Sequence, residues 1–330
     1  MRIAILGATH WHVDLYYVPA LQNAGAEIVA VHDPDPEALK RVCPGLDCPR
    51  YTDHAALLDA QAPDLVFAHA PHAHMTGLAD DLIERGQPFH MEKPMGTHWE
   101  KLDALAVKAA TNKVWTSVAL VSRNYGLVEA LRKAREAGEL GAPVHYYHCL
   151  FAGSPLRYKD WGVGWMLDPE LAGAGPLWNF GPHVIDLFLY LVDDRVTQVQ
   201  AWTSHRVFGL PIEDAATVRL TGASGIVGLG EVSYTMPSSY ERFFSLTTDR
   251  LHCGGTAMGS GKILLRDGSE QPFEGPDSDT VYDAYVRDTL RCFQAGEPAR
   301  ATIADMARVL RLMDAARTSA QTEEPVPIRG

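Results

Sequence analysis

The first third of the chain alternates short apolar runs with amphipathic stretches. Five apolar runs predict strands, at Ile3–Leu6, Ile28–His32, Leu65–Ala68, Phe89–Met91 and Val114–Val121. Between them lie stretches such as Thr76–Arg85, which places its leucines and isoleucine on one helical face before Gly86. Short strands that alternate with helices and are apolar throughout indicate a doubly wound parallel sheet of the α/β class.

The pattern changes after about residue 150, where β-rich runs follow one another with few helices between them. These runs are Val196–Thr203, Ala216–Leu220, Ile226–Tyr234 and Phe243–Thr248. Gly, Pro, Asp and Ser join them, which is typical of a mostly antiparallel sheet in an α+β domain. Apolar residues at helical spacing over Tyr282–Phe293 and a capping box at Thr302–Asp305 predict two final helices. The tail after Thr322 is expected to be a short strand or an extended end.

Composition and charge narrow the class of protein. The chain has 330 residues, 46% of them hydrophobic and 21% charged, and Lys+Arg 29 against Asp+Glu 41 gives a net charge of −12. That acidic balance argues against nucleic-acid and anionic-membrane partners. No apolar run approaches the roughly 20 residues of a membrane span, and Met1–Gly7 does not resemble a signal peptide. The five cysteines include no C-x-x-C pair, so we expect neither a disulfide framework nor a thiolate zinc site, and we expect a cytoplasmic protein.

The residues that follow each predicted strand carry the candidate chemistry, because open parallel sheets bind ligands beyond the carboxyl ends of their strands. Gly7-Ala8-Thr9-His10-Trp11-His12 follows the first strand and retains one glycine of a G-x-G-x-x-G dinucleotide fingerprint. An ordinary βα turn explains this segment equally well. Asp33 follows the second strand, where a carboxylate would bind an adenosine ribose diol and favour NAD over NADP. A turn-forming Asp before proline is the alternative interpretation.

Two further segments contain potential acid–base groups. Lys93 follows the motif His90-Met91-Glu92, which overlaps the apolar run Phe89–Met91. Burial there would lower the pKa of Lys93 toward a useful range. Pro94 is expected to fix the turn after it. Asn179 and His183 are four residues apart, so in one helical turn they would share a face, and Asn179 would position the imidazole. Asp186, among apolar neighbours, is interpreted as structural.

Taken together, these motifs resemble the glucose-fructose oxidoreductase/inositol dehydrogenase (Gfo/Idh/MocA) family over nearly the whole chain. The resemblance rests on Ile28–Pro36, Pro71–His74, Glu92-Lys93-Pro94, the segment from Arg123 to Gly141, and Gly173–Leu187. It implies an NAD-binding Rossmann domain over 1–121 and a substrate-binding and oligomerisation domain over 122–330, with a large, mostly antiparallel open sheet. It also implies a homodimer or homotetramer that transfers a hydride between NAD and a ring carbinol of a sugar, sugar derivative or cyclitol.

The resemblance assigns roles residue by residue. Lys93 and His183 would be catalytic, with His183 as general base, and Asn179 stands where the family has aspartate. Cofactor contacts are expected from Gly7, Thr9, His10, Trp11, His12, Asp33, His69, Pro71, His74, Glu92 and Lys93. Substrate contacts are expected from Lys93, Arg123, Tyr125, Lys159, Trp161, Trp165, Asn179 and His183. Thr9 and His12 replace fingerprint glycines, which bears on how tightly the cofactor is held.

Three alternatives stay open at this stage. Six histidines lie in or after the apolar runs Ile3–Leu6, Leu65–Ala68 and Phe89–Met91: His10, His12, His69, His72, His74 and His90. They would line one crevice. They would contact cofactor or substrate, or, as the weaker alternative, ligate zinc, and we expect no metal. The departures at Thr9, His12 and Asn179 would also suit a cofactor-binding protein that has lost turnover. Finally, a glycosidase or lyase that uses NAD as a transient redox partner would share the same motifs.

Overall fold

The computed structural model of the chain describes residues 1–237, 240–256, 258–276 and 280–329, which form two compact units. The first unit comprises Met1–Ala119, Leu156–Gly173 and Tyr282–Ala307; the second comprises Leu120–Pro155, Ala174–Val281 and Arg308–Gly330. The chain first passes from the first unit to the second between Ala119 and Leu120, close to the expected boundary at residue 121. Two later segments that we expected in the second domain pack with the first unit. The cause is side-chain contact: Tyr158 and Trp161 pack against Trp11, and the Tyr285 hydroxyl donates to the Val118 carbonyl.

A six-stranded parallel sheet forms the centre of the first unit. Its strands are β1 (Arg2–Leu6), β2 (Glu27–His32), β3 (Arg50–Tyr51), β4 (Leu65–Ala68), β5 (Phe89–Met91) and β6 (Thr116–Val118), in the spatial order β3-β2-β1-β4-β5-β6. The predicted doubly wound sheet is therefore confirmed. The last apolar run yields only a three-residue strand, because from Val121 the chain turns into a 3-10 helix. Because β1, β4 and β5 are adjacent and parallel, the carboxyl ends of these three strands lie side by side.

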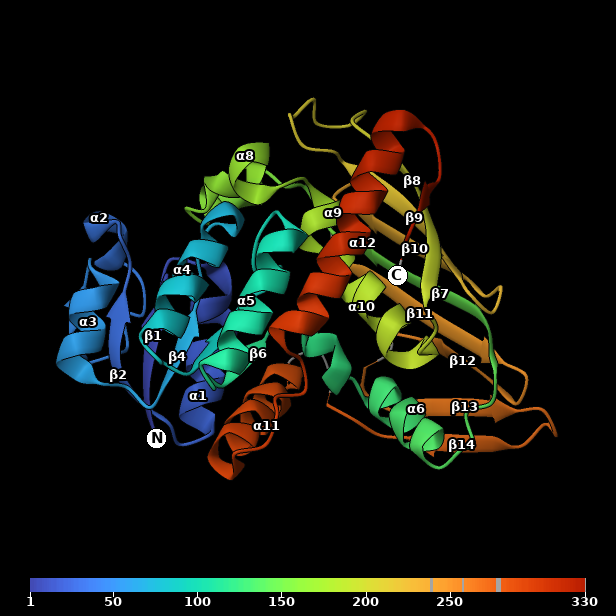
Figure 1. The fold of residues 1–330 in the computed structure, drawn as a ribbon, viewed down its shortest axis with the longest axis horizontal. Helices are drawn as coiled ribbons and strands as arrows, with labels where there is room; N and C mark the ends of the chain where they lie inside the picture. Colours follow the sequence, from blue (N-terminus) through green and yellow to red (C-terminus); the bar gives the residue numbers. More distant parts are fainter. Residues whose placement is uncertain (238–239, 257, 277–279, 330) are drawn as a thin grey trace. The chain divides into compact units, whose positions relative to one another are not determined.

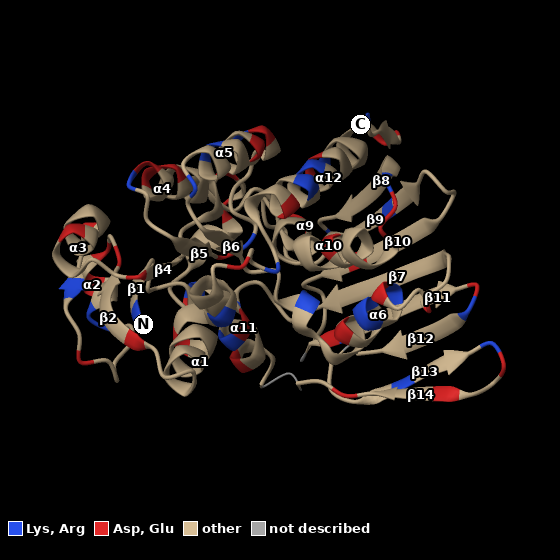
Figure 2. Ribbon diagram, turned by 60° about the horizontal axis from the view of Figure 1, so that its bottom comes forward, with Lys and Arg blue, Asp and Glu red and all other residues tan. Residues whose placement is uncertain are grey.

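Helices cover both faces of this sheet, which explains the continuous apolar character of its strands. The helical segments are η1 (Val13–Tyr17), α1 (Val18–Asn23), α2 (Pro36–Leu39), α3 (His54–Gln61), α4 (His72–Glu84), α5 (Trp99–Thr111), α7 (Arg157–Asp160), η3 (Gly164–Leu167), α8 (Pro169–Ala172) and α11 (Val281–Ala295). Figure 2 shows α4 and α5 on one face and α1 and α11 on the other. Ile3, Ile5 and Phe67 on the central strands are consequently fully buried.

The second unit contains a nine-stranded sheet in which every pair of neighbours is antiparallel except β10 and β7. Its strands are β7 (Pro143–Phe151), β8 (Val196–Ser204), β9 (Ala215–Gly222), β10 (Val227–Ser233), β11 (Glu241–Thr248), β12 (Leu251–Gly255), β13 (Gly261–Leu265), β14 (Glu270–Phe273) and β15 (Val326–Pro327). The mostly antiparallel sheet and the terminal strand were predicted. β7 and β12 to β14 were not, because polar residues interrupt their apolar pattern.

Helices cover one face of this sheet only (Figure 1). They are η2 (Val121–Asn124), α6 (Gly126–Glu136), α9 (Pro176–Asn179), α10 (Gly181–Val192) and α12 (Ile303–Thr322). The predicted capping box at the start of α12 is formed, since the Asp305 carboxylate accepts from the Thr302 amide at 2.9 Å. α10 packs so closely on β10 that a Cβ at Gly230 would lie 2.3 Å from Val184.

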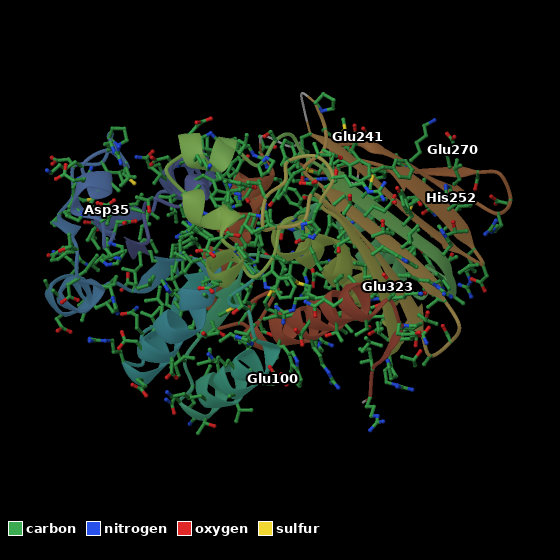
Figure 3. All side chains as sticks on the ribbon, turned by 90° about the horizontal axis from the view of Figure 1, so that it is seen from above. Asp35, Glu100, Glu241, His252, Glu270 and Glu323 are labelled. Carbon is green, nitrogen blue, oxygen red and sulfur yellow. The ribbon has the colours of Figure 1, made fainter. Side chains whose placement is uncertain are left out.

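Within the described part of the second unit, no helix lies on the opposite face of the nine-stranded sheet. Residues alternate between buried and accessible along β9 and β10, as expected for a sheet with one covered face. Trp202 and Phe243 lie on the accessible face, as does His252, which projects from the side of the sheet away from α12 (Figure 3). Among the described residues, no helix is both long and apolar enough to cross a bilayer.

Candidate functional site

The loop after β1 passes extremely close to the end of β4. Gly7 has a φ of +71°, and a Cβ there would lie 2.0 Å from the carbonyl oxygen of His69. Only glycine fits this approach, which is the role of the first fingerprint glycine. The loop then turns back toward β2, where Oδ2 of Asp33 accepts hydrogen bonds from the Thr9 amide at 2.9 Å and from the Thr9 hydroxyl at 2.6 Å.

Asp33 therefore has a structural partner that the sequence did not predict. Its second oxygen, Oδ1, accepts from the Asp35 amide at 3.1 Å, and the side chain is buried. A carboxylate has about four acceptor positions, so three protein donors leave room for one more hydrogen bond. Asp33 thus keeps the capacity to accept one hydroxyl while it fixes the loop that contains Thr9.

Lys93 is buried at the end of β5, with 2% of its surface exposed. Burial lowers the pKa of its ammonium group, as expected, and the neighbouring Glu92 opposes that shift. Glu92 is itself buried, and it accepts hydrogen bonds from His12 Nδ1 at 3.1 Å, the Tyr17 hydroxyl at 2.9 Å and the Lys93 amide at 3.2 Å. Burial raises the pKa of Glu92, but the charge and hydrogen bond of His12 and the charges of Lys93 and His10 outweigh it and hold that pKa well below its usual range. The Lys93–Pro94 peptide bond is cis.

Three of the six expected histidines are buried neutral groups at this edge of the sheet. Burial lowers the pKa of His10, that of His69 to about 4 and that of His72 to about 3. His69 and His72 bond carbonyl oxygens through Nδ1, so each presents an unprotonated Nε2, whereas His10 Nδ1 accepts from the His12 amide and its Nε2 carries the proton. None of these three Nε2 atoms has a hydrogen-bond partner within the described protein. Together they offer one donor and two acceptors.

Two of the other three histidines, His74 and His90, lie away from the expected crevice, whereas His12 is bonded to Glu92. His90 points into the core of the first unit, where it bonds Ser117 and Tyr17. His74 is exposed on the first turn of α4, after Pro71 at the helix N-cap. In the part of the chain that the structure describes, no three His, Cys, Asp or Glu side chains are arranged to hold a metal ion.

An aromatic cluster lies beside the histidines. Trp11 stacks on His10 with ring centroids 4.0 Å apart, and the rings of Tyr158 and Trp165 lie 5.2 and 6.2 Å from Trp11. Trp161, 45% exposed, adds a fourth ring at 6.5 Å. Trp161 and Trp165 were predicted to contact substrate, and the structure brings them together with the cofactor loop. Tyr158 was missed, although it lies in the same aromatic segment, and Lys159 is exposed beside it.

The second unit positions His183 through Ser122, whose hydroxyl lies 3.1 Å from the imidazole Nδ1. The segment that contains Ser122 is tied to α10 by a buried ion pair in which Arg123 Nη2 lies 2.6 Å from Asp186 Oδ1. Arg123, expected near substrate, thus fixes η2 against the helix that carries His183. Asp186 is structural, as interpreted from the sequence.

Asn179 and His183 do not belong to one continuous helix, contrary to the expectation from their spacing. Asn179 ends α9, whereas His183 lies in the first turn of α10, and Phe180 separates the two helices. The Gly-Pro pair at 181–182 starts a new helix, because proline is favoured in a first turn and disfavoured further in. Asn179 is buried and donates from Nδ2 to the Tyr234 hydroxyl at 3.1 Å.

Tyr234 and Arg242 are polar residues of this region that sequence reasoning missed. Arg242 donates to the hydroxyl of Tyr125, a predicted substrate contact, at 2.5 Å. Tyr234 stands at the end of one predicted strand and Arg242 just before another, so strand-end position was the available signal. Lys93 in the first unit is buried, and His183 in the second unit is hydrogen-bonded to Ser122. Each is a side chain of a type that can move the proton of an alcohol.

Both halves of the chain match models of one oxidoreductase family. A family model described as "Oxidoreductase family, NAD-binding Rossmann fold" matches residues 1–120, and a "GFO/IDH/MocA C-terminal domain" model matches residues 128–256. A D-apiose dehydrogenase of Paraburkholderia graminis is 24% identical, over 92% of this chain and 84% of that protein. Inositol 2-dehydrogenase 4 of Saccharopolyspora erythraea is 25% identical, over 79% of this chain and 74% of that protein.

Solved structures share the fold over the full length. A levoglucosan dehydrogenase crystallised with NADH and levoglucosan superposes with a TM-score of 0.87 at 16% identity, covering 100% of both chains. An oxidoreductase domain protein from Kribbella flavida gives the same TM-score at 18% identity, covering 99% of each chain. At these identities the likeness concerns the fold alone.

Proposed function

The chain belongs to the Gfo/Idh/MocA family of NAD-binding oxidoreductases, and from that premise we propose that it is an NAD-dependent dehydrogenase of sugars, sugar derivatives or cyclitols. The observation that carries the proposal is the presence of both motif residues, with Lys93 buried at the end of β5 and His183 bonded to Ser122 through Nδ1. Relatives that act on D-apiose and inositol support the substrate class.

The first unit fits a dinucleotide at the carboxyl edge of its parallel sheet. Gly7 supplies the space that the loop needs, and the buried Nε2 atoms of His10 and His69 supply unsatisfied donor and acceptor positions. Asp33 would accept one ribose hydroxyl and would repel a 2′-phosphate, so NAD is favoured over NADP. When bound, NAD supplies the hydride acceptor.

In the proposed reaction the chain's own residues manage the proton of the substrate hydroxyl. His183 is the general base, and the Ser122 hydroxyl bonded to its Nδ1 orients Nε2 for that role. Lys93 donates a hydrogen bond to the same oxygen and polarises it. Burial lowers the pKa of Lys93, so the alternative assignment makes Lys93 the base and His183 the hydrogen-bond donor.

Several first-unit residues suit a ring-shaped substrate. The rings of Trp11, Trp161 and Trp165 present apolar surfaces of the kind that pack against the C–H face of a sugar. Trp161 is the most exposed of the three, so it is the ring most available to a ligand.

We further propose a cytoplasmic homodimer or homotetramer assembled through the open face of the nine-stranded sheet. Trp202, Phe243 and Leu264 are 51%, 42% and 45% exposed there, and large apolar side chains gathered on one face are typical of interfaces. The five cysteines, all within the described residues, are unpaired, as is usual in the reducing cytosol.

A spectrophotometric panel tests the activity. Cyclitols, aldoses, uronic acids and glycosides are incubated with NAD or NADP, and the absorbance of reduced nicotinamide is followed, with NAD binding measured separately by calorimetry. We expect NADH to accumulate with at least one polyol or sugar, and Lys93→Ala to abolish it while NAD still binds. NAD binding without any turnover would favour the non-catalytic alternative. Cleavage of a glycoside without net NADH would favour the lyase or glycosidase alternative.

A further inference from the structure

Two buried imidazoles, those of His10 and His69, lie side by side at the carboxyl edge of the parallel sheet. Their ring centroids are 5.2 Å apart, and the ring planes differ by 36°. His10 lies in the loop after β1 and His69 directly follows β4, the neighbouring strand. Neither Nε2 atom has a hydrogen-bond partner within the described protein. Buried polar atoms are costly unless they are paired, so these two atoms point to a polar ligand group.

Each ring is oriented by its other nitrogen. His10 Nδ1 accepts from the His12 amide at 3.2 Å, and the ring stacks on Trp11 with centroids 4.0 Å apart. His69 Nδ1 lies 3.2 Å from the Leu6 carbonyl oxygen, to which it donates. By this assignment Nε2 of His10 carries a proton and is a donor, whereas Nε2 of His69 is an acceptor. The two rings therefore present one donor and one acceptor next to each other.

Both imidazoles are neutral at physiological pH. Burial lowers the pKa of His10 well below its usual range, and the charge of Lys93 adds to that shift. Burial likewise lowers the pKa of His69 to about 4, although Glu92 opposes the effect. A neutral group that offers one acceptor and one donor satisfies this pair. A carboxylate does not, because both of its oxygens are acceptors and one of them would face the lone pair of His69 Nε2.

The strand order places the pair on the nicotinamide side of the proposed cofactor site. Asp33, the expected ribose contact, follows β2, and Lys93, the expected contact of the reacting hydroxyl, follows β5. Between them in the sheet stand β1 and β4, whose ends carry His10 and His69. A dinucleotide lies across the carboxyl ends of such strands, so one that extends from Asp33 toward Lys93 passes the two histidines with its nicotinamide half. All four residues belong to the first unit.

We propose that His10 and His69 bind the carboxamide of the nicotinamide, with His10 Nε2 donating to its carbonyl oxygen and His69 Nε2 accepting from its amino group. The inference rests on the proposed function for the identity and the direction of the cofactor. A primary amide is planar and holds an acceptor and a donor side by side, as the two imidazoles do. The carboxamide is attached next to the ring carbon that takes the hydride, so binding it fixes the position of that carbon relative to Lys93.

Calorimetric titration of the protein at pH 8 with four ligands tests this. They are NAD, acetylpyridine adenine dinucleotide, in which a methyl group replaces the amide nitrogen, nicotinic acid adenine dinucleotide, in which a carboxylate replaces the carboxamide, and ADP-ribose, which lacks the pyridine ring. We expect NAD to bind about tenfold tighter or more than either dinucleotide analogue, because neither analogue donates a hydrogen bond to His69.

Variants separate the two contacts. His69→Phe should lower the affinity for NAD to that for the acetylpyridine analogue, while the affinities for that analogue and for ADP-ribose change by less than about threefold. His10→Phe should weaken NAD and the acetylpyridine analogue alike, since both have the carbonyl oxygen, and should leave ADP-ribose unaffected. His90→Phe is the matched control, because His90 is a buried histidine of the same unit whose two ring nitrogens are bonded to Ser117 and Tyr17, and it should preserve the preference for NAD.

The proposal is overturned if the unmodified protein binds NAD and both dinucleotide analogues equally, or if His69→Phe keeps the full preference for NAD. Weaker sugar binding by NAD-loaded His10→Phe, with unchanged dinucleotide affinities, would place the pair at the substrate and would also overturn it. A protein that prefers NAD over both analogues yet forms no NADH would contradict the proposed dehydrogenase activity and leave this inference standing. NADH formation by a protein that binds the three dinucleotides equally would do the reverse.

Discussion

His90 gives the most quantitative test of the electrostatics of the first unit. The imidazole is fully buried, bonded to the Ser117 hydroxyl at 3.2 Å and the Tyr17 hydroxyl at 3.3 Å. Burial lowers its pKa from 6.5 to about 3, an effect that Glu92 partly opposes. Since the unfolded chain binds a proton on this histidine near pH 6.5 and the folded chain does not, folding should become less favourable as the pH falls below 6.5.

The magnitude follows from the two pKa values. At pH 4.5, two pH units below the unfolded pKa, the shift corresponds to about 3 kcal/mol of lost stability. The lowered pKa values of His69 and His72, about 4 and about 3, act in the same direction. The lowered pKa of Glu92 acts in the same direction, since the stability it contributes is lost as the pH falls. That loss begins only near the unfolded pKa of Glu92, so it adds little slope between pH 8 and pH 4.5.

His90→Phe removes one of these titrating groups. At pH 8 the variant should be about 1–2 kcal/mol less stable than the unmodified protein, because the hydrogen bonds of the imidazole to Ser117, Tyr17 and Tyr285 are lost. At pH 4.5 it should be more stable by roughly 1 kcal/mol, because the protonation penalty of about 3 kcal/mol is gone. Urea denaturation followed by tryptophan fluorescence at pH 8, 6 and 4.5 measures the crossing. His98→Phe, at an exposed position, serves as the control and should leave the pH dependence unchanged. Parallel stability curves for His90→Phe and the unmodified protein would refute the assignment of a buried neutral imidazole.

Three further predictions concern cofactor and catalysis. Asp33→Ala should relax the preference for NAD over NADP, measured as the ratio of their dissociation constants; tighter NADP binding by the unmodified protein would reject the role of Asp33. Lys93→Ala and His183→Ala should each lower kcat by about 100-fold or more, with non-additive effects in the double variant and little change in NAD affinity; normal turnover by both single variants would make His183 structural. Asn179→Asp should raise the pKa of a catalytic His183 and shift the acidic limb of the kcat/KM profile to higher pH, so a profile indifferent to position 179 argues against that role.

Much of the architecture could be predicted because its signals are local. The apolar runs that became β1, β2, β4 and β5 lie within one or two residues of the predicted strands, and the capping box of α12 depends on residues three apart. β7 could not be predicted in the same way. It sits between β11 and β10 in the centre of the sheet, yet it contains two histidines and two tyrosines whose pairing partners lie about 80 to 100 residues further on.

The sequence predicted the identity of several candidate site residues, but not the contacts that those residues make. Lys93 and His183 were predicted from motifs, but the burial of Lys93 and the hydrogen bond between Ser122 and His183 depend on chain segments that meet only in the folded protein. The four-residue spacing of Asn179 and His183 wrongly predicted that they share one helix. Spacing alone does not reveal that the Gly-Pro pair at 181–182 starts a second helix between them.

The two departures from the glycine fingerprint have one physical explanation. Thr9 and His12 both place a polar side chain where the fingerprint has glycine, and each bonds a buried carboxylate at the end of a neighbouring strand: Thr9 bonds Asp33 after β2, and His12 bonds Glu92 after β5. A buried carboxylate that lost such a donor would be costly, so each new side chain and its acidic partner stabilise each other. The loop is thus held by side-chain hydrogen bonds where a glycine loop has none, and the degenerate fingerprint is evidence of a differently anchored loop rather than of a lost dinucleotide site.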